Sequence, residues 1–287
     1  MTRINWYIKL IRVHQWYKNL VIFLPIFFAG KLFNLSSLEK ILIGFVALCL
    51  ISSANYILND IVDIKKDKLH PEKKYRPLAF GKITILEASI IGLLFLFASL
   101  LISYQLGIIF LVMILFLFVS TTLYSLWLKN EPILDVVIIA TNFVVRAISG
   151  AFIISLFVSP WLILCPFFLA LYLAVSKRHS DLKMLKKNAI KHKEVLKYYT
   201  PDTTNALMII ATTCFIMSYA LYAFSRTELL LVTLPFAVYT MCRYYLLVNT
   251  GSEIARNPEK IYKDKKLIIT AILWSILIFI IFYYILK

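Results

Sequence analysis

The hydrophobic positions of this chain fall into long runs that short charged segments separate. Most runs approach the length that an α-helix needs to cross the hydrocarbon core of a bilayer. Pro25 and Gly30 interrupt the first run, which makes it the weakest. The pattern predicts an all-α polytopic membrane protein, because helices satisfy their own backbone hydrogen bonds in lipid. We expect about nine spans, at residues 19–34, 38–58, 84–103, 106–128, 132–154, 160–176, 204–224, 228–248 and 267–286.

The segment ahead of the first run, residues 2–18, mixes cationic and apolar side chains. Arg3 and Lys9 lie among Ile4, Trp6 and other apolar residues. This mixture is typical of an amphipathic segment on the membrane surface. The four cysteines of the chain all lie inside apolar runs without metal-ligand spacing, so we interpret them as packing residues. No linker or convincing repeat divides the 287 residues, and we expect a single domain over 1–287.

The charge balance is strongly basic, with 31 Lys and Arg against 15 Asp and Glu and a formal net charge of +16. When the predicted spans alternate across a membrane, most of these cations fall on one side. The positive-inside rule makes that side the cytoplasm. We therefore expect a multi-pass protein of the cell (inner) membrane, with its N-terminus in the cytoplasm and its C-terminus outside. Topology and anionic ligands account for the charge without nucleic acid as a partner.

A cluster of polar residues follows the second predicted span directly. Tyr56, Asn59, Asp63 and Asp67 are spaced three, four and four apart, which places them on one face of a helix with Asp60 beside them. Several oxygen ligands at one helix end suit Mg²⁺. Cations that suit phosphate follow after Pro71, and the segment therefore predicts a site for a Mg²⁺–diphosphate. The alternative is a solvated loop of mixed charge. The cations are Lys73, Lys74 and Arg76.

The predicted span at 132–154 carries polar residues that a membrane helix normally avoids. Asp135, Asn142 and Arg146 share one face at helical pitch. A charge deep in a bilayer costs about 2.5–3.5 kcal/mol, so such residues usually mark a substrate path. Asp135 and Arg146 are about 16 Å apart along the helix axis, too far for a direct pair. Arg146 is expected to face a ligand, and Asp135 is either a metal ligand or a partner of Lys129.

Cations also lie next to the ends of two other spans. Lys129 shortly precedes the span 132–154 with its polar face, which we call the polar stripe. Lys177 and Arg178 directly follow the span 160–176. We interpret all three as phosphate ligands. Snorkelling is the alternative for Lys129, and topogenic charge is the alternative for most lysines of the basic loop after the sixth span.

The motif N-D-x-x-D-x-x-x-D, at Asn59, Asp60, Asp63 and Asp67, resembles the UbiA superfamily of intramembrane prenyltransferases. The likeness covers most of the chain. Its H-P-x-K-x-x-R-P extension and the basic SKRHSDL stretch are similar to the decaprenyl-phosphate phosphoribosyltransferase branch, whereas ordinary prenyltransferases carry a second Asp-rich motif at that second position. The resemblance implies a UbiA-like bundle of about nine helices around a central polar cavity open to the cytoplasm. The segments that carry it are QWYKN, NDIVDIKKDKLHPEKKYRPLAFG, YSLWLKNEPILD, NFVVRAISG and SPWL…SKRHSDL.

The resemblance also implies an activity. The chain would transfer the 5-phosphoribosyl group of phosphoribosyl diphosphate (PRPP) to a polyprenyl (decaprenyl) phosphate and release diphosphate, with Mg²⁺ as cofactor. Asn59 and Asp63 would hold the metal, and Asp60, Asp63 and Asp67 would be the catalytic acidic residues. The donor phosphates would be bound by Lys18, Tyr56, Lys73 and Arg76, and the acceptor head by Lys129, Arg146, Lys177 and Arg178.

Two other functions stay open at this point. A UbiA-type enzyme that joins a prenyl diphosphate to an aromatic or other acceptor shares the first motif. A transporter or lipid-binding scaffold would also place charges inside the membrane, but it leaves the helical register of the aspartates unexplained. None of the histidines has to be catalytic, and His70 is expected to be a supporting or structural residue. Oligomeric state is open, and a homo-oligomer is compatible with the sequence.

Overall fold

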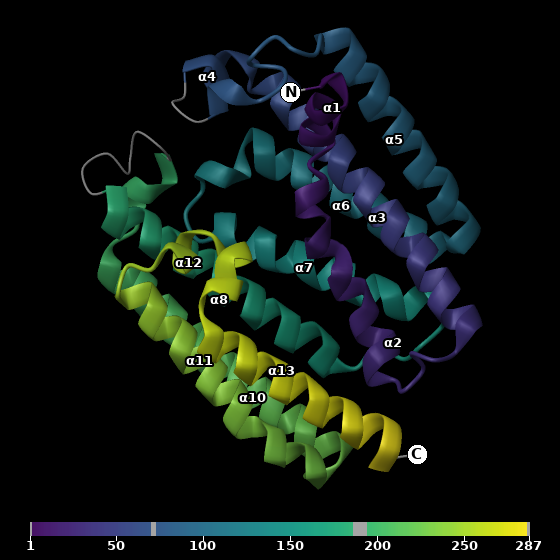
Figure 1. The fold of residues 1–287 in the computed structure, drawn as a ribbon, viewed down its shortest axis with the longest axis vertical. Coiled ribbons are helices and arrows are strands. Elements are labelled where there is room, and N and C mark those ends of the chain that lie inside the picture. Colours follow the sequence, from purple (N-terminus) through teal and green to yellow (C-terminus); the bar gives the residue numbers. More distant parts are fainter. Residues whose placement is uncertain (1, 70–72, 186–193, 286–287) are drawn as a thin grey trace. The chain divides into compact units, whose positions relative to one another are not determined.

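The computed structural model describes residues 2–69, 73–185 and 194–285 of the chain, and in these ranges it contains helices and turns but no β-strand. The chain forms two compact units. Unit 1 comprises Met1–Leu126 and Val145–Val158, and unit 2 comprises Trp127–Val144 and Ser159–Lys287. Each unit contains its own packed helices (Figure 1). The single domain expected over residues 1–287 stays a prediction.

Eight helices of the described ranges are long and apolar enough to cross a membrane, and each coincides with a predicted span. The all-α polytopic membrane fold is therefore confirmed. Two of these spans combine an α-helix with a shorter neighbour, η6 (Glu228–Thr233) before α11 and η8 (Ile281–Ile285) after α13. The α-helices are α3 (Leu35–Val62), α5 (Ile85–Leu106), α6 (Ile108–Leu126), α7 (Leu134–Ile153), α8 (Pro160–Leu185), α10 (Pro201–Arg226), α11 (Leu234–Asn249) and α13 (Lys265–Ile280).

The predicted span at 19–34 has a different structure from the others. Its residues form the end of the 3₁₀-helix η1 (Val13–Phe23) and the short helix α2 (Leu24–Phe28). Pro25 sits in the first turn of α2, where a missing N–H is tolerated, and Gly30 has a φ of 68° soon after its end. Neither segment is one of the eight spanning helices, so the expected number of nine is not confirmed.

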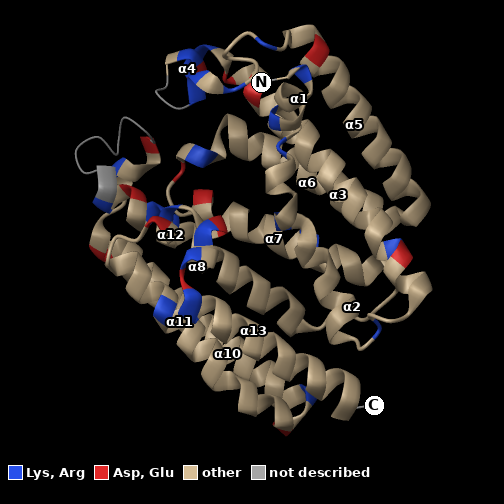
Figure 2. Cartoon of the chain, viewed as in Figure 1, with Lys and Arg blue, Asp and Glu red and all other residues tan. Residues whose placement is uncertain are grey.

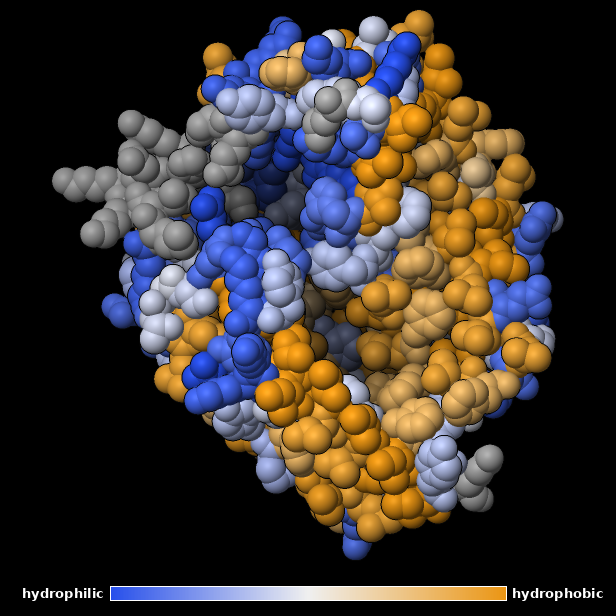
Figure 3. All heavy atoms as spheres, viewed as in Figure 1, coloured by the Kyte–Doolittle hydropathy of each residue, from blue (hydrophilic) through white to orange (hydrophobic). Residues whose placement is uncertain are grey.

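Unit 1 is built on α3. Its core joins η1, α3 and α6 through buried side chains such as Ile22, Ile51 and Ile114. A second cluster, which includes Leu10 and Ile57, docks the N-terminal helix α1 (Arg3–Ile11) on α3. The apolar side chains exposed on α5 give this unit an extended hydrophobic surface, as expected for a face toward lipid (Figure 3).

Unit 2 has its core between α8, α10 and α11. Buried side chains of all three helices meet there, among them Tyr172, Phe215 and Met241. The rings of Tyr172 and Tyr244 pack edge to face with centroids 5.7 Å apart. Short helices connect the long ones across the chain: α4 (Ile64–Leu69), η2 (Lys73–Tyr75), η3 (Leu128–Asn130), η5 (Glu194–Tyr198), α12 (Glu253–Arg256) and η7 (Pro258–Lys263).

Candidate active site

The aspartate motif of unit 1 lies where α3 continues into α4. The Asp63 N–H donates to the carbonyl of Asn59 at 2.9 Å, and the Asp67 N–H donates to the carbonyl of Asp63 at 2.8 Å. These bonds carry the helical register through the junction, although α3 formally ends at Val62. Asn59, Asp63 and Asp67 therefore follow one another at one-turn intervals, as the sequence predicts. Figure 2 shows many of the charged residues of this unit around α4 and α1.

Two carboxylates of the motif are buried and form ion pairs with arginines. Arg12 Nη2 lies 2.5 Å from Asp60 Oδ1, and Arg76 Nη1 lies 3.0 Å from the same oxygen. Arg76 Nη1 also lies 2.7 Å from Asp67 Oδ2. The side chains of Asp60 and Asp67 are 2% and 4% exposed. We call these four residues the arginine–aspartate cluster; its charges balance, as buried carboxylates require.

Arg12 is a member of this cluster that sequence reasoning missed. The sequence assigns it only to a cationic surface segment, because its partner Asp60 is 48 residues away. No local spacing signals such a contact. Arg76, expected to bind donor phosphate, is in this structure a bridge between Asp60 and Asp67, and its phosphate role stays a prediction.

The remaining oxygen ligands of the motif suit a magnesium ion that brings substrate oxygens with it. Asn59 and Asp63 are half-buried and one helical turn apart. No group of three or more His, Cys, Asp or Glu in the described ranges is arranged to hold a metal. Mg²⁺ usually takes one or two carboxylates and completes its shell with water and phosphate. The amide and carboxylate oxygens of Asn59 and Asp63 fit that chemistry.

Other predicted donor-site residues lie on or beside α3. The Arg12 guanidinium stacks over the ring of Tyr56, 4.6 Å from its centroid. Lys18 lies in η1 and Lys73 begins η2, and both are half-buried. The structure thus brings Tyr56 next to the arginine–aspartate cluster. For Lys18 and Lys73 a contact with phosphate stays a prediction.

Arg146 lies deeper along α3 than the aspartate motif. Its Nε donates to Asn19 Oδ1 at 3.0 Å, and buried Asn19 also contacts Ser52 at 3.4 Å. Ser52 and Asp60 are separated by about 12 Å along α3, at 1.5 Å per residue. Arg146 and Asp60 therefore serve different levels of unit 1. On the same 3₁₀-helix as Asn19, the indole N–H of Trp16 donates to Ser53 Oγ at 3.1 Å. The ligand-facing role of Arg146 stays a prediction.

Unit 2 has a buried ion pair on α7 and α8. Arg178 Nε donates to Asp135 Oδ2 at 2.7 Å, and the two side chains are 3% and 0% exposed. The Tyr199 hydroxyl donates to Asp135 Oδ1 at 2.6 Å and accepts the N–H of Ile133 at 2.7 Å. Ile133 has a φ of 66°, an unfavourable conformation for a β-branched residue. Tyr199 was not identified from the sequence.

These contacts change the interpretation of Asp135 and Arg178. Both oxygens of Asp135 accept hydrogen bonds from protein groups, so a role as metal ligand finds no support here. Arg178 was expected at the end of its span, but α8 continues to Leu185 and buries it. Burial, followed by the hydrogen bond to Asp135, raises the pKa of Tyr199. A direct phosphate contact by Arg178 stays a prediction.

Lys177 and Lys129 have more accessible positions. Lys177 is exposed on α8 directly before buried Arg178, and Lys129 is half-buried in η3. Many of the charged residues of unit 2 lie around α12 (Figure 2). There Arg256 Nε lies 3.2 Å from Asp181 Oδ1, which ties α12 to α8. Asn142, the middle residue of the polar stripe, is buried.

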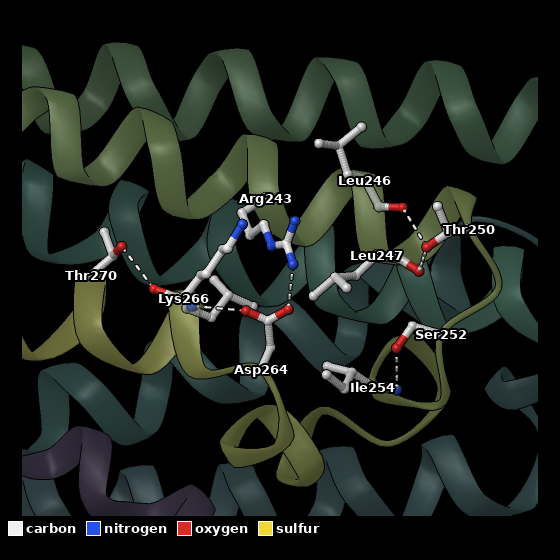
Figure 4. A network of polar contacts seen from close by, with 10 residues as sticks. Arg243, Leu246, Leu247, Thr250, Ser252, Ile254, Asp264, Lys266 and Thr270 are labelled. Carbon is white, nitrogen blue, oxygen red and sulfur yellow. Dashed lines mark hydrogen bonds and ion pairs between the residues drawn. The ribbon is translucent and has the colours of Figure 1, made fainter.

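Arg243 has a structural partner close to the same end of unit 2. Its Nη2 donates to Asp264 Oδ2 at 2.8 Å, while Asp264 Oδ1 accepts the N–H of Leu267 and caps α13 (Figure 4). The hydrogen bond from Arg243 is the main reason why the pKa of Asp264 is lowered. Arg243 is thus held in an ion pair that fixes the start of α13. His70, Pro71 and the lysines at 186–193 lie outside the described residues.

A model of the UbiA prenyltransferase family matches residues 20–258. The chain belongs to the UbiA prenyltransferase family. The decaprenyl-phosphate phosphoribosyltransferase of Mycolicibacterium smegmatis is 30% identical, over 93% of this chain and 89% of that protein. The protein of the same name from Corynebacterium glutamicum is 28% identical, over 93% and 83%.

Solved structures show the same fold for this UbiA family member. A UbiA homolog from Archaeoglobus fulgidus bound to GPP and Mg²⁺ aligns with a TM-score of 0.73 and 21% identity, covering 96% of this chain and 99% of that one. At this level of identity the likeness concerns the fold. Together with the eight spanning helices, it confirms an all-α, multi-pass membrane protein of the UbiA type.

Proposed function

We propose that this UbiA family member transfers the 5-phosphoribosyl group of PRPP to a polyprenyl phosphate and releases diphosphate, at the cytoplasmic face of the membrane. The observation that carries the proposal is the match along 93% of the chain to enzymes named decaprenyl-phosphate phosphoribosyltransferase. The geometry of unit 1 supports it, because oxygen ligands and arginines lie together at the end of α3. The proposed orientation, with the N-terminus cytoplasmic and the C-terminus outside, requires that the segment 19–34 crosses the membrane in addition to the eight spanning helices.

The donor site of the proposal is the end of α3 in unit 1. Asn59 and Asp63 would hold Mg²⁺, which when bound neutralises charge on the departing diphosphate. Arg76, Lys73 and Lys18 would supply the cationic contacts to the donor phosphates. Asp60 and Asp67 would act through Arg76, since both of them hold its guanidinium.

The chemistry needs little from the protein besides charge and position. The bond between the ribose C1 and the diphosphate oxygen breaks, and the electron pair leaves with the diphosphate. An oxygen of the acceptor phosphate forms the new bond to C1. That oxygen is already anionic at neutral pH, so no general base is required. Fixed cations around the leaving group stabilise the negative charge that develops there, and this is the main catalytic contribution.

For the acceptor phosphate we propose the exposed and half-buried cations of unit 2, Lys177 and Lys129. Arg178 would support them by fixing α8 against Asp135. In the branch resembled here, two anionic substrates replace one diphosphate and a neutral acceptor. A basic rather than acidic sequence at SKRHSDL agrees with a second anion.

The test is a choice between donors. Membranes containing the chain are given PRPP or a prenyl diphosphate, each with a polyprenyl phosphate or an aromatic acceptor, and lipid products are identified by mass spectrometry. We expect a polyprenylphosphoryl-5-phosphoribose from PRPP, with a rate about 100-fold lower in Asp63→Asn. A prenylated acceptor without a phosphoribosyl lipid would overturn the proposal in favour of ordinary prenyl transfer. No Mg²⁺-dependent release of diphosphate from any donor would favour a transporter or scaffold.

A further inference from the structure

Arg12 occupies an unusual backbone position between α1 and η1. Its φ of 53° and ψ of 49° are left-handed, which few residues other than glycine adopt. Helix α1 ends at Ile11 and the 3₁₀-helix begins at Val13, so Arg12 alone joins the two helices. Glycine would fit the turn without strain. An arginine at this position therefore indicates a requirement for its side chain.

The side chain of Arg12 is directed at α3. The side chain is 18% exposed, and its guanidinium lies 4.6 Å from the ring centroid of Tyr56 and donates to Asp60 Oδ1 at 2.5 Å. Buried Leu10, packed with Ile57, fixes the end of α1 against the same helix. The packing of α1 on α3 and the side-chain contacts of Arg12 thus both keep Arg12 next to Asp60.

The contact determines how Arg76 is used. Arg76 reaches Asp60 and Asp67 through one atom, Nη1, and its Nε and Nη2 donors take no part in these two ion pairs. Arg76 can leave these two donors out of the ion pairs because Arg12 also neutralises Asp60. Without Arg12, a single guanidinium would have to neutralise two buried carboxylates. Further Arg76 donors would then turn toward Asp60, because a buried charge without a partner is costly.

We infer that Arg12 is a positioning residue of the donor site: it neutralises Asp60 so that Arg76 keeps donors for a diphosphate beside Asn59 and Asp63. The inference rests on the proposed function for the location of the donor. Arg12 itself does not touch the substrate in this account. Its loss weakens phosphate binding through Arg76 and through one additional negative charge at the site.

The experiment measures binding of inorganic diphosphate with Mg²⁺ to the purified full chain in detergent, so it needs neither PRPP nor lipid acceptor. The variant is Arg12→Gly, which keeps the left-handed turn and removes only the side chain. We expect its Kd for Mg²⁺–diphosphate to rise about tenfold, and Arg12→Lys to stay within about threefold of wild type. In Arg12→Gly/Asp60→Asn the extra negative charge is gone, and most of the affinity returns.

The matched control is Arg3→Gly. Arg3 begins α1, the helix that ends just before Arg12, and pairs with Glu87 at the surface, so its removal leaves diphosphate binding unchanged. Equal Kd values for wild type and Arg12→Gly would overturn the inference. If Arg12→Gly does not fold, Arg12→Lys decides: a loss as large as tenfold despite the retained charge would also overturn it. Wild type that binds Mg²⁺–diphosphate but transfers no phosphoribosyl group would end the proposed function and leave this inference standing.

Discussion

Arg178 and Asp135 form a fully buried ion pair in unit 2, with Nε of the arginine 2.7 Å from Oδ2 of the carboxylate. The second carboxylate oxygen accepts the hydroxyl of Tyr199. From the sequence alone, Arg178 and its neighbour Lys177 are equally good candidates for a phosphate ligand. The structure separates them, because one is buried in an ion pair and the other is exposed on the same helix.

Replacing Arg178 by methionine should destabilise the protein, whereas Lys177→Met should not. Loss of one partner leaves the Asp135 charge buried, which costs about 3–5 kcal/mol. Removal of an exposed charge changes the free energy of unfolding by about 0.5 kcal/mol or less. Thermal unfolding in detergent measures the difference. Equal unfolding midpoints for the two variants would show that the ion pair does not stabilise the fold. Arg178→Met/Asp135→Leu is expected to recover part of the loss.

Tyr199→Phe should remove a source of stability that depends on pH. The pKa of Tyr199 is raised in the folded protein, so the group stabilises the fold below its unfolded value of 10.0. This contribution is lost as the pH rises above that value toward the folded pKa. We expect the unfolding midpoint of wild type to fall more steeply with pH above 10.0 than that of Tyr199→Phe. At neutral pH the variant should lose about 1–3 kcal/mol, since Asp135 Oδ1 and the Ile133 N–H each lose their hydrogen bond to the tyrosine hydroxyl. Parallel pH curves would contradict this.

Asp264→Ala should weaken the start of α13 more than Glu253→Gln weakens α12. Asp264 caps its helix and pairs with Arg243, and loss of a helix cap costs about 0.5–2 kcal/mol. Glu253 pairs with Lys260 and Lys263 at the exposed surface, which lowers its pKa to about 2 but contributes little stability.

The same pair predicts an acid dependence. Because the pKa of Asp264 is lowered, its contribution is present above the unfolded value of 3.8 and is lost as the pH falls through the folded pKa. Hydrogen exchange at the first turn of α13, compared in wild type and Asp264→Ala over this range, measures it. Exchange that is equally fast in both proteins at neutral pH would refute the role of the cap.

Gly150→Ala should be strongly destabilising. A Cβ at Gly150 would lie 2.1 Å from the carbonyl oxygen of Ile22, so the backbone of α7 or η1 would have to move. Overpacking of this kind costs about 1–3 kcal/mol or more. Gly92→Ala is the matched control, because its nearest neighbour is a side-chain atom, Ile57 Cγ2, at 3.3 Å, so a shift of a few tenths of an ångström is enough. Similar unfolding midpoints for both variants would contradict the close approach.

The length of the hydrophobic runs was sufficient to predict most of the fold. Runs of membrane length predict a helix wherever backbone groups must be satisfied in lipid, and eight of the predicted spans are helices of the described chain. The exception is the predicted span at 19–34, where Pro25 and Gly30 interrupt the run and the chain forms short helices. Helical spacing also predicted the register of Asn59, Asp63 and Asp67, because that register depends on local backbone bonds.

Contacts between distant segments were not predictable in this way. Arg12 with Asp60 and Tyr199 with Asp135 join residues 48 and 64 positions apart, and no spacing within one helix indicates them. Counting charges also could not tell buried Arg178 from exposed Lys177, since both follow the same apolar run. The positions of polar residues within the predicted spans can be read from the sequence, but the pairing of these residues depends on tertiary packing.

The central claim concerns which group of PRPP reaches the lipid, and a double-label experiment measures it. Membranes with the chain receive a polyprenyl phosphate and PRPP that carries a carbon label in the ribose and a phosphorus label in its diphosphate. We predict that the ribose label enters the lipid extract while an equal amount of the phosphorus label appears in water as free diphosphate. A lipid extract without the ribose label, or with both labels together, would contradict the account.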